Sequence, residues 1–125
     1  MSLEIERADG YAVLSVTPEN QKLDSMLAPQ MKSQLVLLNH EGFKSIIVDL
    51  SGSRYCDSSG LSAILVGNRL CRDLTGTFVL CGLQPLVQKL ITISQLDSIL
   101  NIVPTLDEAR QFVAMEEVER QVNGQ

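Results

Sequence analysis

The sequence is poor in aromatic side chains and in histidine. Aromatic residues make up 4% of the 125 residues, tryptophan is absent, and the one histidine is His40. So few rings provide no platform for stacking nucleobases. Lysine and arginine are scattered along the chain, and the net charge of -5 opposes the phosphate backbone of nucleic acid. We therefore expect no nucleic-acid partner.

A long hydrophobic run is also lacking. No apolar stretch approaches the roughly 20 residues that a membrane-spanning helix needs. The first residues, Met1 to Glu6, have neither the basic nor the apolar region of a signal peptide. We expect a cytoplasmic protein with no membrane partner.

Cysteine is scarce as well. The three cysteines, Cys56, Cys71 and Cys81, do not have the paired spacing of metal ligands. Cys71 and Cys81 lie among apolar residues, as structural thiols do. We expect reduced thiols, as in other cytoplasmic proteins, with no metal site and no cofactor.

Length and composition indicate one folded domain. Hydrophobic residues make up 45% of the sequence and charged residues 20%, which is typical of a globular protein. A chain of 125 residues buries one core but not two. We expect a single domain over residues 1–117, followed by a polar tail at 118–125 that frays.

Hydrophobic periodicity predicts alternating strands and helices. Apolar and charged residues alternate at 3–7, and an apolar run follows at 11–16; between them, Asp9-Gly10 favours a hairpin. Further along the chain we expect a polar loop at 17–22, a helix capped by Asp24 or Ser25 that ends near Gly42, a strand at 45–50, a helix at 58–74, a strand at 77–81, a helix opening at Pro85, a strand at 99–103 and a final helix after the capping box Thr105-Leu106-Asp107-Glu108. The order ββαβαβαβα predicts an α/β fold, a small mixed sheet with helices packed on it. Strands separated by helices should run parallel.

The segment from Asp49 to Gly60 is the most informative for function. A buried strand ends there, a short loop follows, and a helix begins at Asp57-Ser58-Ser59-Gly60. Ligands and partners of open α/β sheets meet the protein at the carboxyl ends of strands. Aspartate and serine are also ordinary helix caps, so a purely structural role is the alternative at this point.

A phosphate on Ser59 would lie at the start of this helix. There it would meet free backbone N–H groups and the positive end of the helix dipole. We therefore expect phosphorylation to leave the helix folded. The surface beside Asp57 would gain about -1.5 to -2 charges, enough to repel an acidic or apolar partner.

Two segments of the chain resemble the STAS family, specifically the bacterial anti-sigma factor antagonists. They are the strand Ile46-Ile47-Val48-Asp49-Leu50-Ser51 and the block Asp57-Ser58-Ser59-Gly60-Leu61. Weaker matches are Leu23-Asp24 with Pro29, Cys81-Gly82-Leu83 leading into Leu86 to Leu90, and Thr105-Leu106-Asp107-Glu108-Ala109. The resemblance covers nearly the whole chain. It implies the STAS fold for the predicted order of elements.

The resemblance also implies a regulatory role for Ser59. In that family the second serine of the block is phosphorylated by an anti-sigma factor that is itself a serine kinase. The unphosphorylated domain sequesters this kinase and thereby frees the sigma factor. Ser59 matches the phosphorylated position. A metal-dependent serine phosphatase resets the cycle, so ATP and metal belong to the two partner enzymes.

The same resemblance places partner-binding residues around Ser59. The matched block implies that Asp57, Ser58, Gly60 and Leu61 shape the docking surface. Asp24 matches an acidic position before the first helix that contributes to kinase contact in relatives. A simple helix cap is an equally good interpretation of Asp24.

Other functions fit the sequence less well. A serine hydrolase needs a Gly-x-Ser-x-Gly elbow and a histidine base, but Asp57 stands where the first glycine is needed and His40 lies at a predicted helix end. An aspartyl-phosphate receiver at Asp49 needs an acidic cluster and a later lysine, which the strand ending at Cys81 does not supply. We expect no enzymatic activity. The serious alternative is a non-switching STAS adapter of a signalling or lipid-transport assembly, in which Ser59 is only a cap.

Overall fold

The computed structural model describes residues 3–18 and 22–124. Residues 19–21, which belong to the expected polar loop, lie outside the described residues, as do residues 1, 2 and 125. The strands are β1 (Leu3–Arg7), β2 (Ala12–Val16), β3 (Lys22–Leu23), β4 (Ile46–Asp49), β5 (Tyr55–Cys56), β6 (Phe78–Cys81) and β7 (Asn101–Val103). The helices are α1 (Ala28–His40), α2 (Ser58–Asp73), α3 (Pro85–Ile93), the 3-10 helix η1 (Leu96–Ser98) and α4 (Leu106–Asn123).

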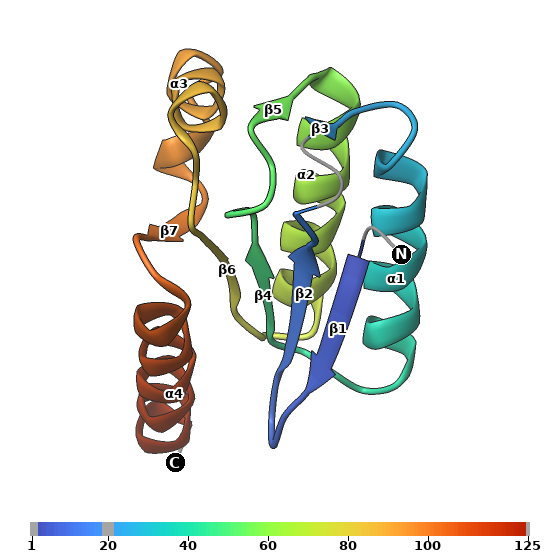
Figure 1. Cartoon of the computed structure of the whole chain (residues 1–125). Helices are drawn as coiled ribbons and strands as arrows, with labels where there is room; N and C mark the ends of the chain where they lie inside the picture. Colours follow the sequence, from blue (N-terminus) through green and yellow to red (C-terminus); the bar gives the residue numbers. More distant parts are fainter. Residues whose placement is uncertain (1–2, 19–21, 125) are drawn as a thin grey trace.

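Five of the strands form one mixed sheet in the order β1-β2-β4-β6-β7 (Figure 1). β1 and β2 pair antiparallel through a turn in which Gly10 has a φ of 89°, a conformation that favours glycine. The other neighbours pair in parallel, and Ile47 of β4 lies between Val13 of β2 and Val79 of β6. The predicted α/β fold with a mixed sheet is confirmed.

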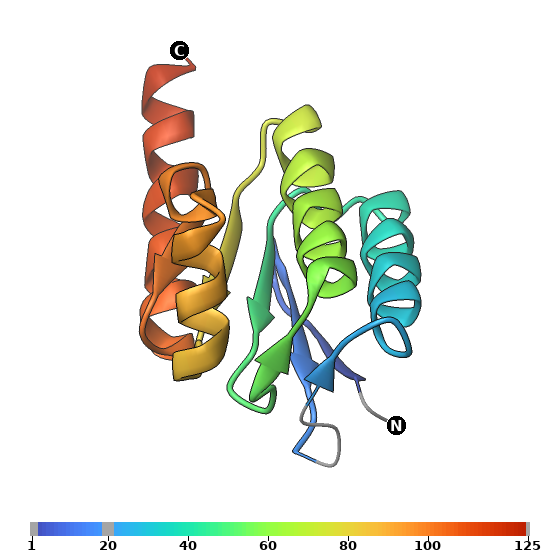
Figure 2. The ribbon, with the colours of Figure 1, turned by 90° about the horizontal axis from the view of Figure 1, so that it is seen from above.

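Alternate strand residues point into two hydrophobic cores. Leu14, Val48 and Leu80 lie in the larger core, with apolar residues of α1, α2 and α3. Val13 and Ile47 lie in the smaller core beneath α4. Figure 2 shows α1 and α2 on one side of the sheet and α4 on the other. Cover on both faces explains why the central strands are continuous apolar runs.

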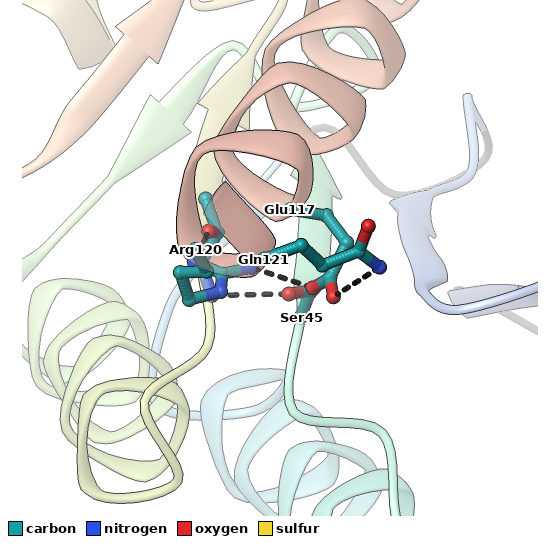
Figure 3. Close-up of polar contacts among 5 residues, drawn as sticks. Ser45, Glu117, Arg120 and Gln121 are labelled. Carbon is teal, nitrogen blue, oxygen red and sulfur yellow. Dashed lines mark hydrogen bonds and ion pairs between the residues drawn. The ribbon is translucent and has the colours of Figure 1, made fainter. Parts of the chain in front are cut away.

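The final helix extends beyond the predicted end of the domain at residue 117. α4 continues to Asn123, so residues 118–123 are helical, in contrast to the expected frayed tail. Arg120 ties this segment to the residue before β6, because it donates a hydrogen bond to the Thr77 hydroxyl at 2.8 Å. It also donates a hydrogen bond to Glu117 at 3.1 Å (Figure 3). The polar composition of residues 118–123 suggested a tail, because the sequence does not show that Arg120 meets Thr77 in the folded chain.

α4 is the longest helix of the described residues. No helix in this part of the chain is long and apolar enough to cross a membrane.

A second arginine fixes the other end of α4. Arg110 donates hydrogen bonds to both carboxylate oxygens of Glu6, at 2.9 and 2.8 Å, and to the Tyr11 hydroxyl at 2.7 Å. The first causes of the altered pKa values are these hydrogen bonds: the pKa of Glu6 is lowered and that of Arg110 is raised. The last helix is therefore joined to β1 and to the residue directly before β2.

Candidate functional site

A two-stranded sheet brings the starts of two helices together. β3 and β5 pair in parallel, with Leu23 opposite Cys56. α1 and α2 follow these strands, so their first turns lie at the same end of the molecule (Figures 1 and 2). Neither strand was predicted, because two residues are too few to show a periodicity. The pairing places Asp24 and Asp57 in matching positions, each directly after a paired residue.

Gly60 permits this close approach of β3 to α2. A Cβ atom at Gly60 would lie 2.4 Å from the Leu23 carbonyl oxygen and 2.6 Å from the Cys56 sulfur. No other residue fits without moving the backbone of β3. Gly60 is buried, so its observed role is to let the helix start pack against β3.

Asp57 caps the helix that carries the serines. Its Oδ1 atom accepts hydrogen bonds from the backbone N–H groups of Ser59 at 2.9 Å and Gly60 at 3.1 Å. We expected these N–H groups to be free to bind a phosphate on Ser59. This prediction is wrong, because both already donate hydrogen bonds to the Asp57 carboxylate. The capping role that the sequence suggested for this aspartate is confirmed.

The two serines of the block differ in exposure. Ser58 is exposed and Ser59 is half-buried. The hydroxyl of Ser59 forms no hydrogen bond within residues 3–18 and 22–124. The hydroxyl oxygen is thus free to accept a chemical group without the loss of an internal contact.

Ser59 borders a hollow of about 380 Å³ between the first turns of α1 and α2. The lining residues are Ser25, Ala28, Pro29, Lys32, Ser58, Ser59 and Ser62. Lys32 is half-buried and is the cation among them. Sequence reasoning missed Lys32, since nothing along the chain indicates that α1 lies against α2 at this point.

Asp24 organises the turn before α1 and is not its N-cap. Its Oδ1 atom accepts a hydrogen bond from the backbone of Met26 at 3.0 Å, and its carbonyl oxygen accepts from Leu27 and Ala28. The N-cap of α1 is Leu27, without a side-chain hydrogen bond, so neither Asp24 nor Ser25 caps the helix as predicted. The β3–β5 pairing nevertheless places Asp24 at the same end of the molecule as Ser59.

The family of the chain follows from comparison with known proteins. The STAS domain family model matches residues 2–109, most of the chain. The chain belongs to the STAS domain family. The residues that build the Ser59 site, from Leu23 to Leu61, all lie inside the matched range of this STAS domain.

Several similar proteins are named as anti-sigma factor antagonists. A Bordetella bronchiseptica protein named as a candidate anti-sigma factor antagonist, BtrV, is 27% identical over 87% of this chain and 91% of its own length. The structure of an anti-sigma factor antagonist from Mycobacterium paratuberculosis has a TM-score of 0.78 and 25% identity, over 90% of this chain and 92% of that one. The Bacillus cell fate determinant SpoIIAA in its phosphorylated form has the same fold, with a TM-score of 0.69 and 21% identity over 89% of this chain and 98% of its own.

Leu61 of this STAS domain faces a second, more apolar hollow. This hollow has a volume of about 470 Å³ and runs along α2 from Ser58 to η1. Leu65 and Val66 line it from α2, and Ile99, which is 52% exposed, lines it from the segment after η1. The apolar surface thus begins at Leu61, two residues after Ser59. Sequence reasoning identified Leu61 but not Ile99, because η1 was not predicted.

The thiol beneath the site is unreactive. Cys56 is buried against Gly60, and burial, followed by the charge of Asp57, raises the pKa of the thiol to about 12. Burial likewise raises the pKa of Cys71 and Cys81 to about 12. All three are free cysteines. Each thiol is therefore protonated at neutral pH.

Two residues were considered for enzymatic functions, His40 as a hydrolase base and Asp49 as a phosphate-accepting aspartate. His40 lies far from Ser59, and Asp49 accepts a hydrogen bond from the backbone. His40 is the last residue of α1, while Ser59 lies beside the first turn of that helix, about 20 Å away along its axis. Asp49 accepts a hydrogen bond from the backbone of Ser51 at 3.0 Å, and its Oδ1 atom packs against Gly82. Among the residues that the structure describes, no group of three or more metal-ligating side chains is present.

Proposed function

We propose that this STAS domain is an anti-sigma factor antagonist that binds an anti-sigma factor serine kinase while Ser59 is unmodified. Capture of the kinase releases the sigma factor, and phosphorylation of Ser59 ends the capture. The observation that carries the proposal is the Ser59 hydroxyl, which lines an open hollow and forms no hydrogen bond within the described residues. Similarity to BtrV and to the Mycobacterium antagonist supports the class of partner.

The chain supplies only the acceptor oxygen in this reaction. A bond forms between Ser59 Oγ and the γ-phosphorus of ATP, and the bond from that phosphorus to its bridging oxygen breaks. ADP leaves, and the hydroxyl proton passes to a base of the kinase or to water. A serine phosphatase reverses the modification by hydrolysis and releases inorganic phosphate. ATP and metal ions belong to these partner enzymes, and we propose no catalysis by this chain.

Binding and release use the same surface. Ser58 is exposed, and Leu61 opens onto the apolar hollow along α2, so the first turn of α2 offers both polar and apolar contacts. A phosphate on Ser59 adds about -1.5 to -2 charges next to Asp57. A partner that packs on this turn would then bury additional negative charge, which costs several kcal/mol.

The fold itself should tolerate the phosphate. The Ser59 hydroxyl makes no internal contact that phosphorylation would remove, and Asp57 continues to cap the helix. The phosphorylated SpoIIAA structure, which has this fold, supports the same view. Because sigma factors act on transcription, we place the cycle in the cytoplasm.

Mass spectrometry of the intact protein tests the proposal. The wild-type chain, Ser59→Ala and Ser58→Ala are each incubated with ATP and the cognate anti-sigma kinase. Wild type and Ser58→Ala should gain one phosphate, and Ser59→Ala none; the neighbouring serine is the matched control. A protein that binds the kinase without ever gaining a phosphate would be a non-switching adapter. Absence of kinase binding would overturn the proposed partner.

A further inference from the structure

The hollow beside Ser59 is built from the first turns of two helices. α1 contributes Ala28, Pro29 and Lys32, and α2 contributes Ser59 and Ser62. All the polar groups in it other than Lys32 are hydroxyls or backbone atoms. The hollow is thus lined by neutral donors and one cation, and by no carboxylate.

Lys32 lines the hollow from α1. It lies three residues after Pro29 and four after Ala28, so the three residues share one face of the helix. Side chains of a helix lean toward its N-terminus, so the Lys32 side chain extends from α1 in the direction of the hollow that Ser59 also lines. Lys32 forms no ion pair or hydrogen bond within residues 3–18 and 22–124. Its charge is available to a new anion.

The usual anion site at a helix start is closed in α2. The Asp57 carboxylate accepts from both Ser59 N–H and Gly60 N–H, and it would repel a phosphate placed near these groups. The start of α1, in contrast, has no side-chain cap and no acidic residue in its first turn. Asp57 therefore repels a phosphate on Ser59, and Lys32 is the cation that lines the hollow on the α1 side.

We propose that Lys32 binds the phosphate of phosphorylated Ser59 across the hollow. This inference rests on the proposed function in so far as Ser59 is the modified residue. The ion pair adds a charge-assisted hydrogen bond between α1 and α2 that the unmodified protein lacks. It also offsets the repulsion between the phosphate and Asp57, so the cap of α2 survives phosphorylation. The phosphorylated state thus has a binding site for its own phosphate.

The second ionisation of the phosphate is the direct readout. Phosphoserine is incorporated at position 59 during translation, without any kinase, and the phosphate is titrated by phosphorus NMR. A nearby ammonium favours the dianion, so the phosphate pKa should be lower in the wild type than in Lys32→Gln, by about half a unit. Asp24 and Asp57 raise the phosphate pKa in both proteins, and Lys22 is present in both, so the difference isolates Lys32.

Two further variants serve as controls. Lys32→Arg keeps the charge and should keep the lowered phosphate pKa. Lys44→Gln removes a lysine in the loop after the far end of α1 and should leave the phosphate pKa at the wild-type value. Equal phosphate pKa values in wild type and Lys32→Gln would overturn the ion pair.

If Lys32→Gln does not fold, a second measurement tests whether Lys32 binds the phosphate on Ser59. In the wild-type protein, the NMR signals of the Lys32 ε-methylene should shift between the unmodified and phosphorylated forms, while those of Lys44 stay in place. Unmoved Lys32 signals would contradict the proposal. Because the phosphate is installed without a kinase, both measurements stand even if the cognate kinase does not modify Ser59. The mass experiment tests that separate question.

Discussion

The polar side chains of α4 and those at the starts of α1 and α2 differ in how many internal contacts they make. On the α4 side, Arg110 holds Glu6 and Tyr11, and Arg120 holds Thr77 and Glu117. At the first turns of α1 and α2, the hydroxyl of Ser59 and the ammonium group of Lys32 form no hydrogen bond within the described residues. The two arginines of α4 join elements of the fold, whereas Ser59 and Lys32 are available for a partner or a modification. A change of charge at Ser59 therefore breaks no side-chain hydrogen bond of the described residues.

Replacement of Gly60 gives the largest expected effect, because it removes the space on which the site depends. The Cβ atom of Gly60→Ala would meet the Leu23 carbonyl oxygen and the Cys56 sulfur. We expect a loss of about 3 kcal/mol in the free energy of unfolding, measured by urea denaturation. Ser62→Ala, an exposed change on the same helix, should shift the free energy by no more than about 0.5 kcal/mol. A Gly60→Ala protein as stable as wild type would show that β3 moves freely away from α2.

A charge on Ser59 should affect binding rather than folding. Ser59→Asp should weaken binding to the cognate kinase about a hundredfold, which equals about 2.7 kcal/mol, as measured by calorimetric titration. Ser59→Asn has the same size without the charge and should retain more affinity, and Ser59→Ala should remain a constitutive binder. Wild-type affinity in Ser59→Asp would refute a charge-operated switch.

Removal of the helix cap should have a smaller effect, now on the fold. Asp57→Ala leaves the N–H groups of Ser59 and Gly60 without their acceptor and should lower the free energy of unfolding by about 1 kcal/mol. Asp57→Asn keeps an acceptor oxygen and should recover most of this loss. Equal stability of the alanine and asparagine variants would mean that water or another group replaces the cap.

The Arg110–Glu6 pair on the α4 side should have the smallest effect, visible mainly in its pH dependence. Its hydrogen bond lowers the pKa of Glu6 in the folded protein. A carboxyl with a lowered pKa stabilises the fold above its ordinary pKa, and this contribution is lost as the pH falls through the lowered value. The stability difference between wild type and Arg110→Met should therefore shrink as the pH falls below about 4.

The control for this pair is Glu4→Gln on the same strand, which removes an exposed carboxylate outside the Arg110 contact. Glu4→Gln should change the free energy of unfolding by the same amount in the wild-type protein and in Arg110→Met. A difference between wild type and Arg110→Met that stays constant over this acid range would show that Arg110 acts through Tyr11 or through packing instead of Glu6.

The sequence predicted the features that repeat along the chain. Apolar periodicity identified the strands of the main sheet, and the block from Asp57 to Leu61 identified the start of α2. The short strand β3 escaped prediction because two residues have no period. The role of Lys32 depends on which turn of α1 faces α2, a relation that exists only in the folded chain. An aspartate at a helix start predicts a cap. Only the structure shows that the Asp57 carboxylate accepts from the N–H groups of Ser59 and Gly60, which are then not available to a phosphate.

The buried thiol of Cys56 has a consequence for the kinds of signal that the site receives. Cys56 lies against Gly60, and its raised pKa keeps the sulfur protonated. Oxidants and disulfides react with thiolates, so they find no reactive group there at neutral pH. Under the proposed function, the first turn of α2 therefore responds to phosphoryl transfer at Ser59 and not to oxidation of the thiol beneath it.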